Sequence, residues 1–326
     1  MTKAVRIHKP GSANELVYES IEVGVPTEGE VRLKQTAIGL NYIDVYHRTG
    51  LYPLAEYPAV IGMEAAGVVE DIGSGVDGFS IGDRVAYAGL PVGAYALARN
   101  IPAHRLIKIP DSIDDEQAAA MMLQGMTASY LLNRSYPVQK GDTILIHAAA
   151  GGVGLIACQW AKALGATVIG TVGSDAKAEL AKANGCDHPI LYTSENFTDR
   201  VRDITNGEGV PVVYDSIGKD TFEGSLDCLK PLGVMVSYGN ASGPVTAFDP
   251  GILAAKGSLY LTRPTLMTHT AKREDLVNIA GGLIDMVASG KVKINIGQRY
   301  PLSQAKQAHI DLEARKTTGS TVFIPD

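Results

Sequence analysis

The sequence predicts a two-domain α/β protein, in which a β-rich domain is joined to a domain built on a doubly wound parallel sheet. Three observations lead to this prediction. The chain has 326 residues, whereas single domains commonly have about 100–200. Its first third is rich in glycine and proline and holds short β-like runs. From Asp142 onward, buried strand patterns alternate with helical ones, which is typical of a doubly wound sheet.

The β-rich part contains three clear strand patterns, at Val31–Ile38, Glu64–Ile72 and Asp83–Tyr87. Turn signals such as Gly73-Ser74-Gly75 separate them. Short strands at close spacing favour a compact, barrel-like β domain. Near Asp111 the composition becomes rich in alanine and methionine, and this predicts a helix over residues 112–132.

The second part alternates between strands and helices. The run Thr143–His147 is apolar without alternation, as expected for a strand covered on both faces. The elements that follow are predicted at Gly154–Leu164, Thr167–Val172, Ala176–Ala183, Val210–Asp215 and Gly233–Tyr238. A helix over Arg273–Ser289 then leads to a β tail, Ser320–Ile324, which we expect to return to the first domain. The predicted domains are therefore 1–122 with 264–326, and 123–263.

Composition excludes several classes of protein. Hydrophobic residues make up 45% and charged residues 20%, and the net charge is −6, so nucleic acid is not expected as a partner. No apolar run approaches the ~20 residues of a membrane helix. The three cysteines, Cys158, Cys186 and Cys228, are widely spaced and form neither a disulfide framework nor a CxxC site. A reducing, cytoplasmic location is expected.

A dinucleotide fingerprint follows the first strand of the second domain. The stretch that begins at Ala148 aligns Ala149, Gly151 and Gly154 with G-x-G-x-x-G, so alanine replaces the first glycine. Gly151 would let the backbone approach a pyrophosphate, and Gly154 would let helix and strand pack closely. A tight structural turn is the alternative. The strand before, the helix after and the second strand favour dinucleotide binding.

The end of the second strand indicates which dinucleotide binds. NAD sites usually carry an acidic residue about 20 residues beyond the fingerprint, where it binds the ribose 2′-hydroxyl. Val172 occupies that place here, followed by Gly173 and Ser174. Lys177, one turn into the next helix, could reach a 2′-phosphate, so NADPH is predicted. Asp175 lies in the same loop, and either it or Ser174 is expected to cap the helix.

Together these motifs resemble the quinone oxidoreductase family of the medium-chain dehydrogenase superfamily, related to zeta-crystallin. The signature residues are Gly141-Asp142, Leu145, Ala149-Ala150-Gly151-Gly152, Gly154, Gln159 and Lys162. Further matching stretches span nearly the whole chain, including residues 37–44, 62–67, 82–85, 214–218 and 237–240. The resemblance implies a GroES-like catalytic domain and a Rossmann domain, with the active site in the cleft between them.

The resemblance also implies roles for individual residues. Asn41 and Thr127 would lie near the nicotinamide, and Tyr130, Gly152 and Val153 along the cofactor. The residues around the adenosine 2′-phosphate would be Gly173, Ser174, Lys177, Tyr192 and Arg315. Ser216 and Asn240 would line the adenine and ribose side, and Tyr46 and Tyr52 the substrate pocket.

Zinc ligands are missing from the sequence. Zinc members of the superfamily place a cysteine where Asn41 stands and a histidine where Met63 stands, with a further ligand near Leu123–Gln124. Catalytic zinc needs about three protein ligands, so no metal is expected. A quinone suits such a site, because it is already electrophilic and needs mainly to be aligned with the cofactor. Two alternatives stay open: an enone or alkenal double-bond reductase, and an NADPH-binding protein with an RNA-binding or structural role.

The run Gly257–Thr262 is β-prone and ends the predicted parallel sheet. An open apolar edge strand can pair with another chain. The resemblance implies that two such edges join across a two-fold axis, so a homodimer is expected.

Overall fold

The computed structural model describes residues 1–326. The chain divides into two compact units. The first comprises Met1–Met126, Thr270–Ala288 and Ile294–Asp326, and the second comprises Thr127–His269 and Ser289–Lys293. The first unit holds two sheets and the second holds one.

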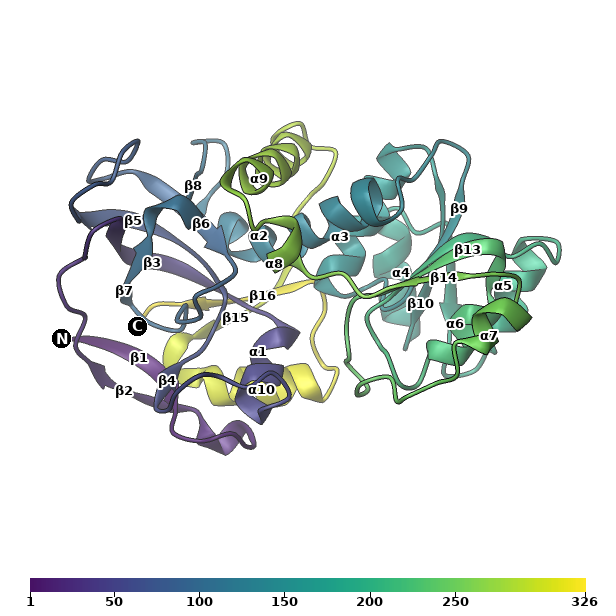
Figure 1. Cartoon of the computed structure of the whole chain (residues 1–326), viewed down its shortest axis with the longest axis horizontal. Helices are drawn as coiled ribbons and strands as arrows, with labels where there is room; N and C mark the ends of the chain where they lie inside the picture. Colours follow the sequence, from purple (N-terminus) through teal and green to yellow (C-terminus); the bar gives the residue numbers. More distant parts are fainter. The chain divides into compact units, whose positions relative to one another are not determined.

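The first unit is built on a seven-stranded sheet with the order β15-β16-β3-β5-β6-β8, and β7 also pairs with β3 (Figure 1). A smaller sheet has the order β2-β1-β4. The tail strand β16 pairs with β3 although the two are far apart in sequence. The strands are β1 Thr2–Ile7, β2 Val17–Ile21, β3 Glu30–Leu40, β4 Ala59–Val60, β5 Glu64–Ile72, β6 Arg84–Ala88, β7 Ala98–Pro102, β8 Ile107–Lys108, β15 Ile296–Pro301 and β16 Ser320–Ile324.

Four α-helices accompany these strands: α1 Tyr42–Thr49, α2 Asp115–Tyr130, α9 Arg273–Ala288 and α10 Ala305–Glu313. The start of α1 is fixed by a capping box, in which the Asn41 backbone N–H donates to Asp44 Oδ2 at 2.9 Å. Gly50 ends the helix in the left-handed region, at φ 82°. The core between sheet and helices is apolar and includes Leu33, Ile38 and Phe323, all fully buried.

The second unit is built on a parallel sheet with the order β11-β10-β9-β12-β13-β14. The strands are β9 Thr143–Ile146, β10 Thr167–Val172, β11 His188–Leu191, β12 Val210–Asp215, β13 Leu229–Ser237 and β14 Tyr260–Thr262. The chain moves outward from β9 to β11 and then returns to β12 on the other side of β9. Ligands of open α/β sheets bind at the carboxyl ends of the strands beside such a reversal.

Six helices belong to the second unit: α3 Gly152–Ala163, α4 Asp175–Ala183, α5 Phe197–Ile204, α6 Phe222–Asp227, α7 Gly251–Ala255 and α8 Leu266–His269. Phe197 of α5 and Phe222 of α6 pack against one face of the sheet, with Leu145 and Val213. Helices α3 and α4 lie on the other face (Figure 1). The predicted doubly wound sheet is therefore confirmed, and α3 begins two residues earlier than the glycine spacing suggested.

The run Gly257–Thr262 is only half a strand, which corrects the sequence prediction. Gly257 and Ser258 have φ values of 112° and 56° and form a turn, in which the Gly257 carbonyl accepts from the Leu232 N–H. Only Tyr260–Thr262 extends, as β14, and it occupies the outer edge of the sheet beside β13.

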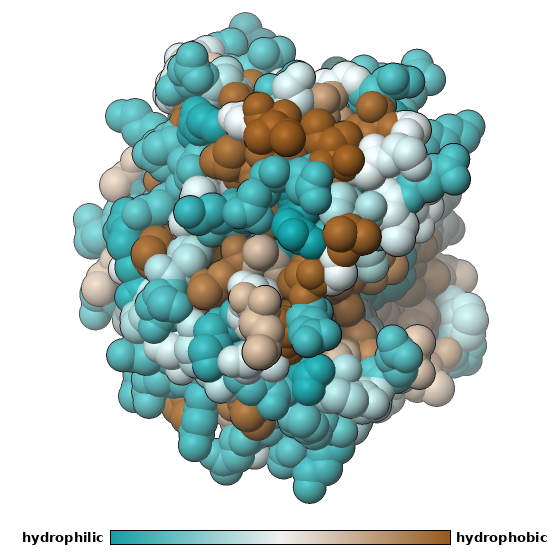
Figure 2. All heavy atoms as spheres, turned by 90° about the vertical axis from the view of Figure 1, so that its left-hand side faces the viewer, coloured by the Kyte–Doolittle hydropathy of each residue, from teal (hydrophilic) through white to brown (hydrophobic).

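The surface drawn in Figure 2 is largely hydrophilic, and apolar side chains gather mainly in one group near the top of the view. Exposed large apolar side chains occur along the whole chain, as at Val25, Ile81 and Tyr260. None of the helices combines the length and apolar character that crossing a bilayer requires.

Candidate functional site

The turn between β9 and α3 is tight and depends on glycine. Ala148 adopts φ 54°, a left-handed conformation that is uncommon for a non-glycine residue. The Gly151 N–H donates back to the Ala148 carbonyl at 2.9 Å. A Cβ on Gly154 would lie 2.3 Å from the same carbonyl oxygen. Gly154 therefore permits the close approach of helix and strand that the fingerprint requires.

Ala149 departs from the glycine pattern, and the structure accounts for it. Its side chain is fully buried and lies over Gly170 of the neighbouring strand β10. A Cβ on Gly170 would lie 2.5 Å from the Ala149 methyl carbon. The space that a glycine at 149 would leave open is thus occupied by the methyl group, and glycine stands on the adjacent strand instead.

The first turn of α3 can receive an anion. Gly151 is the N-cap residue and supplies no side-chain cap, so the first amide groups of the helix keep their donor capacity. Gly151, Gly152 and Val153 are all partly exposed. Amide donors at the start of a helix, with glycines that admit close approach, form a phosphate-binding arrangement.

The end of β10 carries the residues predicted to select the cofactor. Ser174 is the N-cap of α4, and its hydroxyl accepts from the Lys177 N–H at 3.4 Å, so Ser174 rather than Asp175 caps the helix. The end of β11 lies alongside, because Val172 pairs with Leu191. A Cβ on Gly173 would lie 2.6 Å from the Tyr192 hydroxyl. Gly173, Ser174, Lys177 and Tyr192 are therefore neighbours at one edge of the sheet.

Ser216 and Asn240 follow the next two strands, β12 and β13, and are also neighbours. The Ala241 N–H donates to the Ser216 carbonyl at 3.1 Å, and a Cβ on Gly239 would lie 2.4 Å from that oxygen. Asp215 shapes the loop, since its Oδ1 accepts from the Ile217 N–H at 2.7 Å. Both predicted residues are partly exposed at the carboxyl edge of the sheet.

Thr127 and Tyr130 lie near the end of α2 and are almost entirely buried. The Tyr130 ring stacks on His269, with centroids 4.4 Å apart and planes at 8°. Burial raises the pKa of the Tyr130 hydroxyl, although Arg263 and a hydrogen bond to Thr127 act in the opposite direction. Tyr130 is therefore neutral at physiological pH and held in one orientation.

In the first unit, Asn41 belongs to a buried chain of polar side chains. Asn41 Nδ2 donates to Glu64 Oε2 at 2.6 Å, and Asn41 Oδ1 accepts from Gln124 Nε2 at 3.0 Å. Gln124 Oε1 in turn accepts from the Ser320 hydroxyl at 2.6 Å. Three of these residues stand on β5, α2 and β16, and Asn41 follows β3.

Sequence reasoning did not assign Glu64, Gln124 or Ser320 to the site. Two features of the sequence could have indicated a role for these residues: Gln124 stands where zinc members carry a ligand, and Glu64 directly follows Met63. Glu64 is fully buried, and this burial raises the pKa of its carboxyl group to about 8, although the hydrogen bond from Asn41 lowers it. Burial also raises the pKa of Asp44 to about 7.

Tyr46 and Tyr52 form an aromatic cluster with Tyr42. The rings of Tyr46 and Tyr52 meet edge to face with centroids 5.1 Å apart, and those of Tyr42 and Tyr46 are 5.5 Å apart. Sequence reasoning missed Tyr42, whose spacing of four residues from Tyr46 places both on one face of α1. Arg315 belongs to the same unit, follows α10 at φ 59° and is exposed.

No group of three or more His, Cys, Asp or Glu side chains is arranged to hold a metal ion. The positions that correspond to zinc ligands carry two amides, Asn41 and Gln124, which bond to each other, and the buried thioether of Met63. Amide and thioether groups are poor ligands for Zn²⁺.

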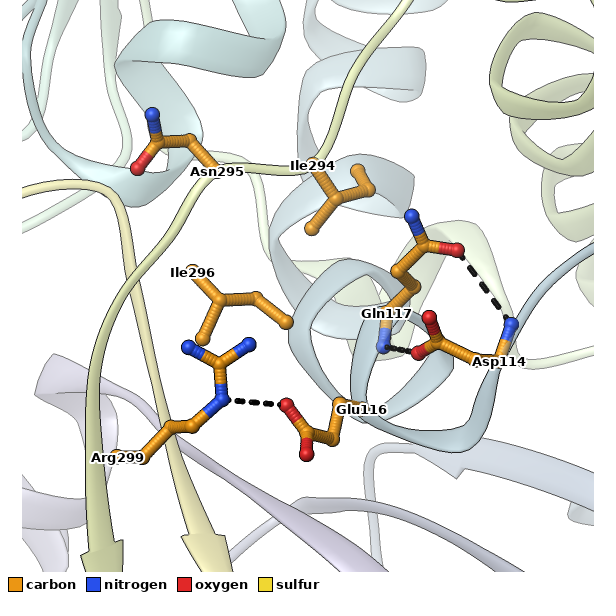
Figure 3. A pocket seen from close by; sticks show the side chains of 7 residues that line it. All are labelled: Asp114, Glu116, Gln117, Ile294, Asn295, Ile296 and Arg299. Carbon is orange, nitrogen blue, oxygen red and sulfur yellow. Dashed lines mark hydrogen bonds and ion pairs between the residues drawn. The ribbon is translucent and has the colours of Figure 1, made fainter.

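A separate surface pocket of about 350 Å³ lies between the start of α2 and β15 (Figure 3). Its polar groups pair with each other: Arg299 Nε donates to Glu116 Oε2 at 2.6 Å, and the Gln117 N–H donates to Asp114 Oδ1 at 2.7 Å. None of the predicted site residues lines it.

Comparison with known proteins identifies relatives over the whole chain. A family described as "Alcohol dehydrogenase GroES-like domain" matches residues 27–111, and one described as "Zinc-binding dehydrogenase" matches residues 152–277. A quinone oxidoreductase of Pseudomonas aeruginosa is 51% identical over 100% of both chains. A 2-haloacrylate reductase of Burkholderia is 46% identical over 100% of this chain and 99% of its own.

A solved structure, that of Escherichia coli quinone oxidoreductase complexed with NADPH, is 47% identical and superposes with a TM-score of 0.98. The match covers 99% of this chain and 100% of that one. The fold is thus a GroES-like domain with a Rossmann domain, as the sequence predicts. With the fingerprint turn, the glycines around it and full-length relatives at about half identity, the chain belongs to the quinone oxidoreductase family of medium-chain dehydrogenases.

Proposed function

We propose that this protein is an NADPH:quinone oxidoreductase that works without a metal ion. The observation that carries the proposal is the edge of the second unit's sheet, where a glycine-lined phosphate turn adjoins a β10 end with no carboxylate and a lysine one helical turn away. The Escherichia coli relative, whose structure was solved in complex with NADPH, supports the cofactor, and the relatives named quinone oxidoreductase support the substrate.

The residues present fit a dinucleotide phosphate. At Gly154 and Gly173 a Cβ would lie within 3 Å of neighbouring atoms, so the close packing of the turn and of the β10 end requires glycine at both positions. The amides of the first turn of α3 would hold the pyrophosphate. Ser174, Lys177, Tyr192 and Arg315 would bind the 2′-phosphate. Ser216 and Asn240 would line the adenine and ribose side.

Quinone reduction by NADPH requires few catalytic groups from the protein. NADPH supplies a hydride and, with one proton, converts a quinone to a hydroquinone. Alignment of reactants can lower a barrier by about 7–11 kcal/mol, so no single acid or base is required. Asn41 and Thr127 would lie near the nicotinamide, with Tyr130 and Val153 along the cofactor, and Tyr46 and Tyr52 would border the quinone. The proton would come from solvent or from one of these two tyrosines.

The decisive experiment follows NADPH absorbance with 1,4-benzoquinone, an ortho-quinone and a small enone in parallel. We expect rapid oxidation with both quinones. The enone arm is necessary because one relative is named 2-haloacrylate reductase. Turnover of the enone alone would replace the quinone assignment by a double-bond reductase. Salt-dependent RNA binding without turnover of any acceptor would favour a non-enzymatic role.

Metal independence is part of the same proposal and rests on the chemistry of the donor groups. Metal analysis of the purified protein should find no stoichiometric zinc. Loss of quinone reduction on chelation, with recovery on adding zinc, would contradict it.

We further propose a homodimer joined through the edge strand β14, and a cytoplasmic location. The exposed edge at Tyr260 supports the first, and three free, buried cysteines are consistent with the second.

A further inference from the structure

The buried chain of hydrogen bonds that links Glu64, Asn41, Gln124 and Ser320 can run in either of two directions. As the structure has it, Ser320 donates to Gln124, Gln124 donates to Asn41, and Asn41 donates to Glu64. The Ser320 hydroxyl also lies 3.1 Å from the Ala120 carbonyl. A hydroxyl has one hydrogen and can serve only one of these two acceptors at a time.

In the opposite direction, every bond reverses. A protonated Glu64 would donate to Asn41, whose amide, turned by half a revolution, would donate to Gln124. Gln124 would donate to the Ser320 oxygen, and Ser320 would donate to the Ala120 carbonyl. The four side chains keep their bonds to one another in both arrangements, so the charge of Glu64 decides between them.

The two directions differ in what Asn41 can offer to a ligand. An amide nitrogen has two hydrogens. When Glu64 is ionised, its carboxylate accepts one of the two hydrogens of Asn41 Nδ2. The other hydrogen on the same nitrogen can then be donated to a ligand. With the amide turned, an oxygen lone pair takes that place. A carbonyl oxygen that gains electron density during reduction is stabilised by a donor and repelled by an acceptor.

We propose that Glu64 is a positioning residue: its carboxylate, through the chain that ends at Ser320, holds the Asn41 amide with an N–H group available to the carbonyl oxygen of the electron acceptor. The proposal rests on the proposed function, because it takes the acceptor to be a quinone bound near Asn41. Asn41 is the residue that touches the acceptor, and Glu64 acts only through it.

The packing around Glu64 favours such a role over a simple structural bond. Its Oε1 accepts from the Leu123 N–H at 2.8 Å, so the carboxyl group is fixed between β5 and α2. A Cβ on Gly39 would lie 2.5 Å from Glu64 Oε2. Glycine at this position therefore leaves room for the Glu64 carboxyl group beside β3. The buried titratable groups that face it are Asp44 of α1, Tyr87 of β6 and Tyr95, and none is a cation.

The first test is the variant Glu64→Gln. Its amide donates where the carboxylate accepted, so it should lock the chain in the reversed direction. Above pH 8, where Glu64 is ionised, we expect kcat with 1,4-benzoquinone to fall about 100- to 1000-fold, the range for loss of one preorganised donor, while the Kd for NADPH changes less than about threefold. Wild-type kcat should rise with pH as Glu64 ionises, and this rise should be absent in the variant. Asp44 is retained, so any remaining pH dependence belongs to it.

The double variant Glu64→Gln with Asn41→Asp separates positioning from stability. The carboxylate introduced at position 41 would accept from both Gln124 and the amide introduced at position 64, so the bonds are restored but the N–H group is lost. We expect the melting temperature to recover and kcat to stay low. Recovery of both would show that Glu64 acts only structurally. Glu116→Gln, on the exposed start of α2, is the matched control and should leave kcat unchanged. Should Glu64→Gln fail to fold, Ser320→Ala weakens the chain from its other end and should lower kcat by a smaller factor.

A readout independent of activity is the side-chain amide signals of Asn41 and Gln124 in ¹H–¹⁵N spectra. They should shift together as pH crosses the Glu64 ionisation in the wild type, and not in Glu64→Gln. Signals that do not respond, or a wild-type kcat and pH profile in Glu64→Gln, would overturn the positioning role. A wild-type protein that reduces no quinone would instead refute the proposed function and leave the spectroscopic test valid.

Discussion

At the scale of single residues, Lys177 is the residue through which the proposed site would choose its cofactor. It lies one turn into α4, whose N-cap Ser174 follows the end of β10. A charge-assisted hydrogen bond between a lysine and a phosphate contributes about 1.5–3 kcal/mol. NADH has no 2′-phosphate and gains nothing from this contact.

We therefore expect Lys177→Ala to weaken NADPH binding about 10- to 100-fold and to leave the Kd for NADH nearly unchanged. Fluorescence titration of both cofactors measures this. Lys182→Ala, on the same helix and paired with Glu179 at 3.0 Å, is the control and should change neither value. An equal loss for NADPH and NADH would mean that Lys177 does not bind the phosphate.

Glu64 gives a second prediction at this scale, on stability. Burial raises its pKa to about 8 from an ordinary value of 4.5, so the folded state keeps a proton that the unfolded state releases. The stability linked to this proton is fully present below pH 4.5 and is lost as the pH rises toward 8. His309 acts in the opposite sense, because burial lowers its pKa to about 3, and its contribution is lost as the pH falls below 6.5.

Glu64→Gln has no such proton. The unfolding free energy of the wild type minus that of the variant should fall by about 1 kcal/mol per pH unit as the pH rises from about 5 to 8. Urea unfolding at each pH measures it, and the His309 contribution cancels in the difference. A difference that does not change with pH would show that Glu64 keeps its charge in the folded protein.

At the scale of elements, the turn between β9 and α3 depends most on backbone space. In Gly154→Ala the new methyl group would lie 2.3 Å from the Ala148 carbonyl oxygen, which cannot move away as a flexible side chain would. We expect a loss of about 1–3 kcal/mol in unfolding free energy and strongly weakened NADPH binding. Gly281→Ala in α9 has open space around it and should gain about 1 kcal/mol. Denaturant unfolding and NADPH titration compare the two variants. If Gly154→Ala keeps the unfolding free energy and the NADPH affinity of the wild type, the turn adapts to the methyl group.

The sequence predicted the elements whose patterns are local. Buried strands such as Thr167–Val172 and Val210–Asp215 are found with the expected bounds, because an apolar run ended by turn residues defines them. Helices α1 and α10 have only 8 and 9 residues, too short for a clear helical period, and unlike the equally short α4 they lie outside the alternating strand and helix pattern of the second unit. The contact between Gln124 and Ser320 joins positions 196 residues apart, so no spacing rule could have found it.

At the scale of the whole molecule, the proposed dimer depends on the edge of the parallel sheet. β14 is a three-residue strand on the outer edge, and Tyr260 is 61% exposed. A lysine on an edge strand opposes pairing with a second edge. Sedimentation should show a dimer for the wild type and a monomer for Tyr260→Lys. Val277→Lys, an exposed apolar residue of α9, is the control and should stay dimeric. A monomeric wild type at micromolar concentration would refute the proposed interface.

The domain boundaries predicted from the sequence, 1–122 with 264–326 and 123–263, remain a prediction. Residues 123–263 produced alone should fold cooperatively and bind NADPH with reduced affinity, because Arg315 is absent from that fragment. Calorimetry and titration of the fragment would test this. A fragment that stays unfolded would show that its sheet needs the rest of the chain.

The exchange of small residues between Ala149 and Gly170 constrains how this chain can evolve. The methyl group of Ala149, in the turn after β9, occupies the space that Gly170 of β10 leaves vacant. A mutation of Gly170 to alanine would clash while Ala149 is present, whereas Ala149 can become glycine at the modest cost of a small void. Because a Cβ on Gly170 would also lie 2.7 Å from Cys186 Sγ, alanine at 170 requires both glycine at 149 and a shift of the Cys186 side chain. The residue at position 149 of the fingerprint is thus constrained by Gly170 and Cys186, which lie outside the fingerprint in the sequence.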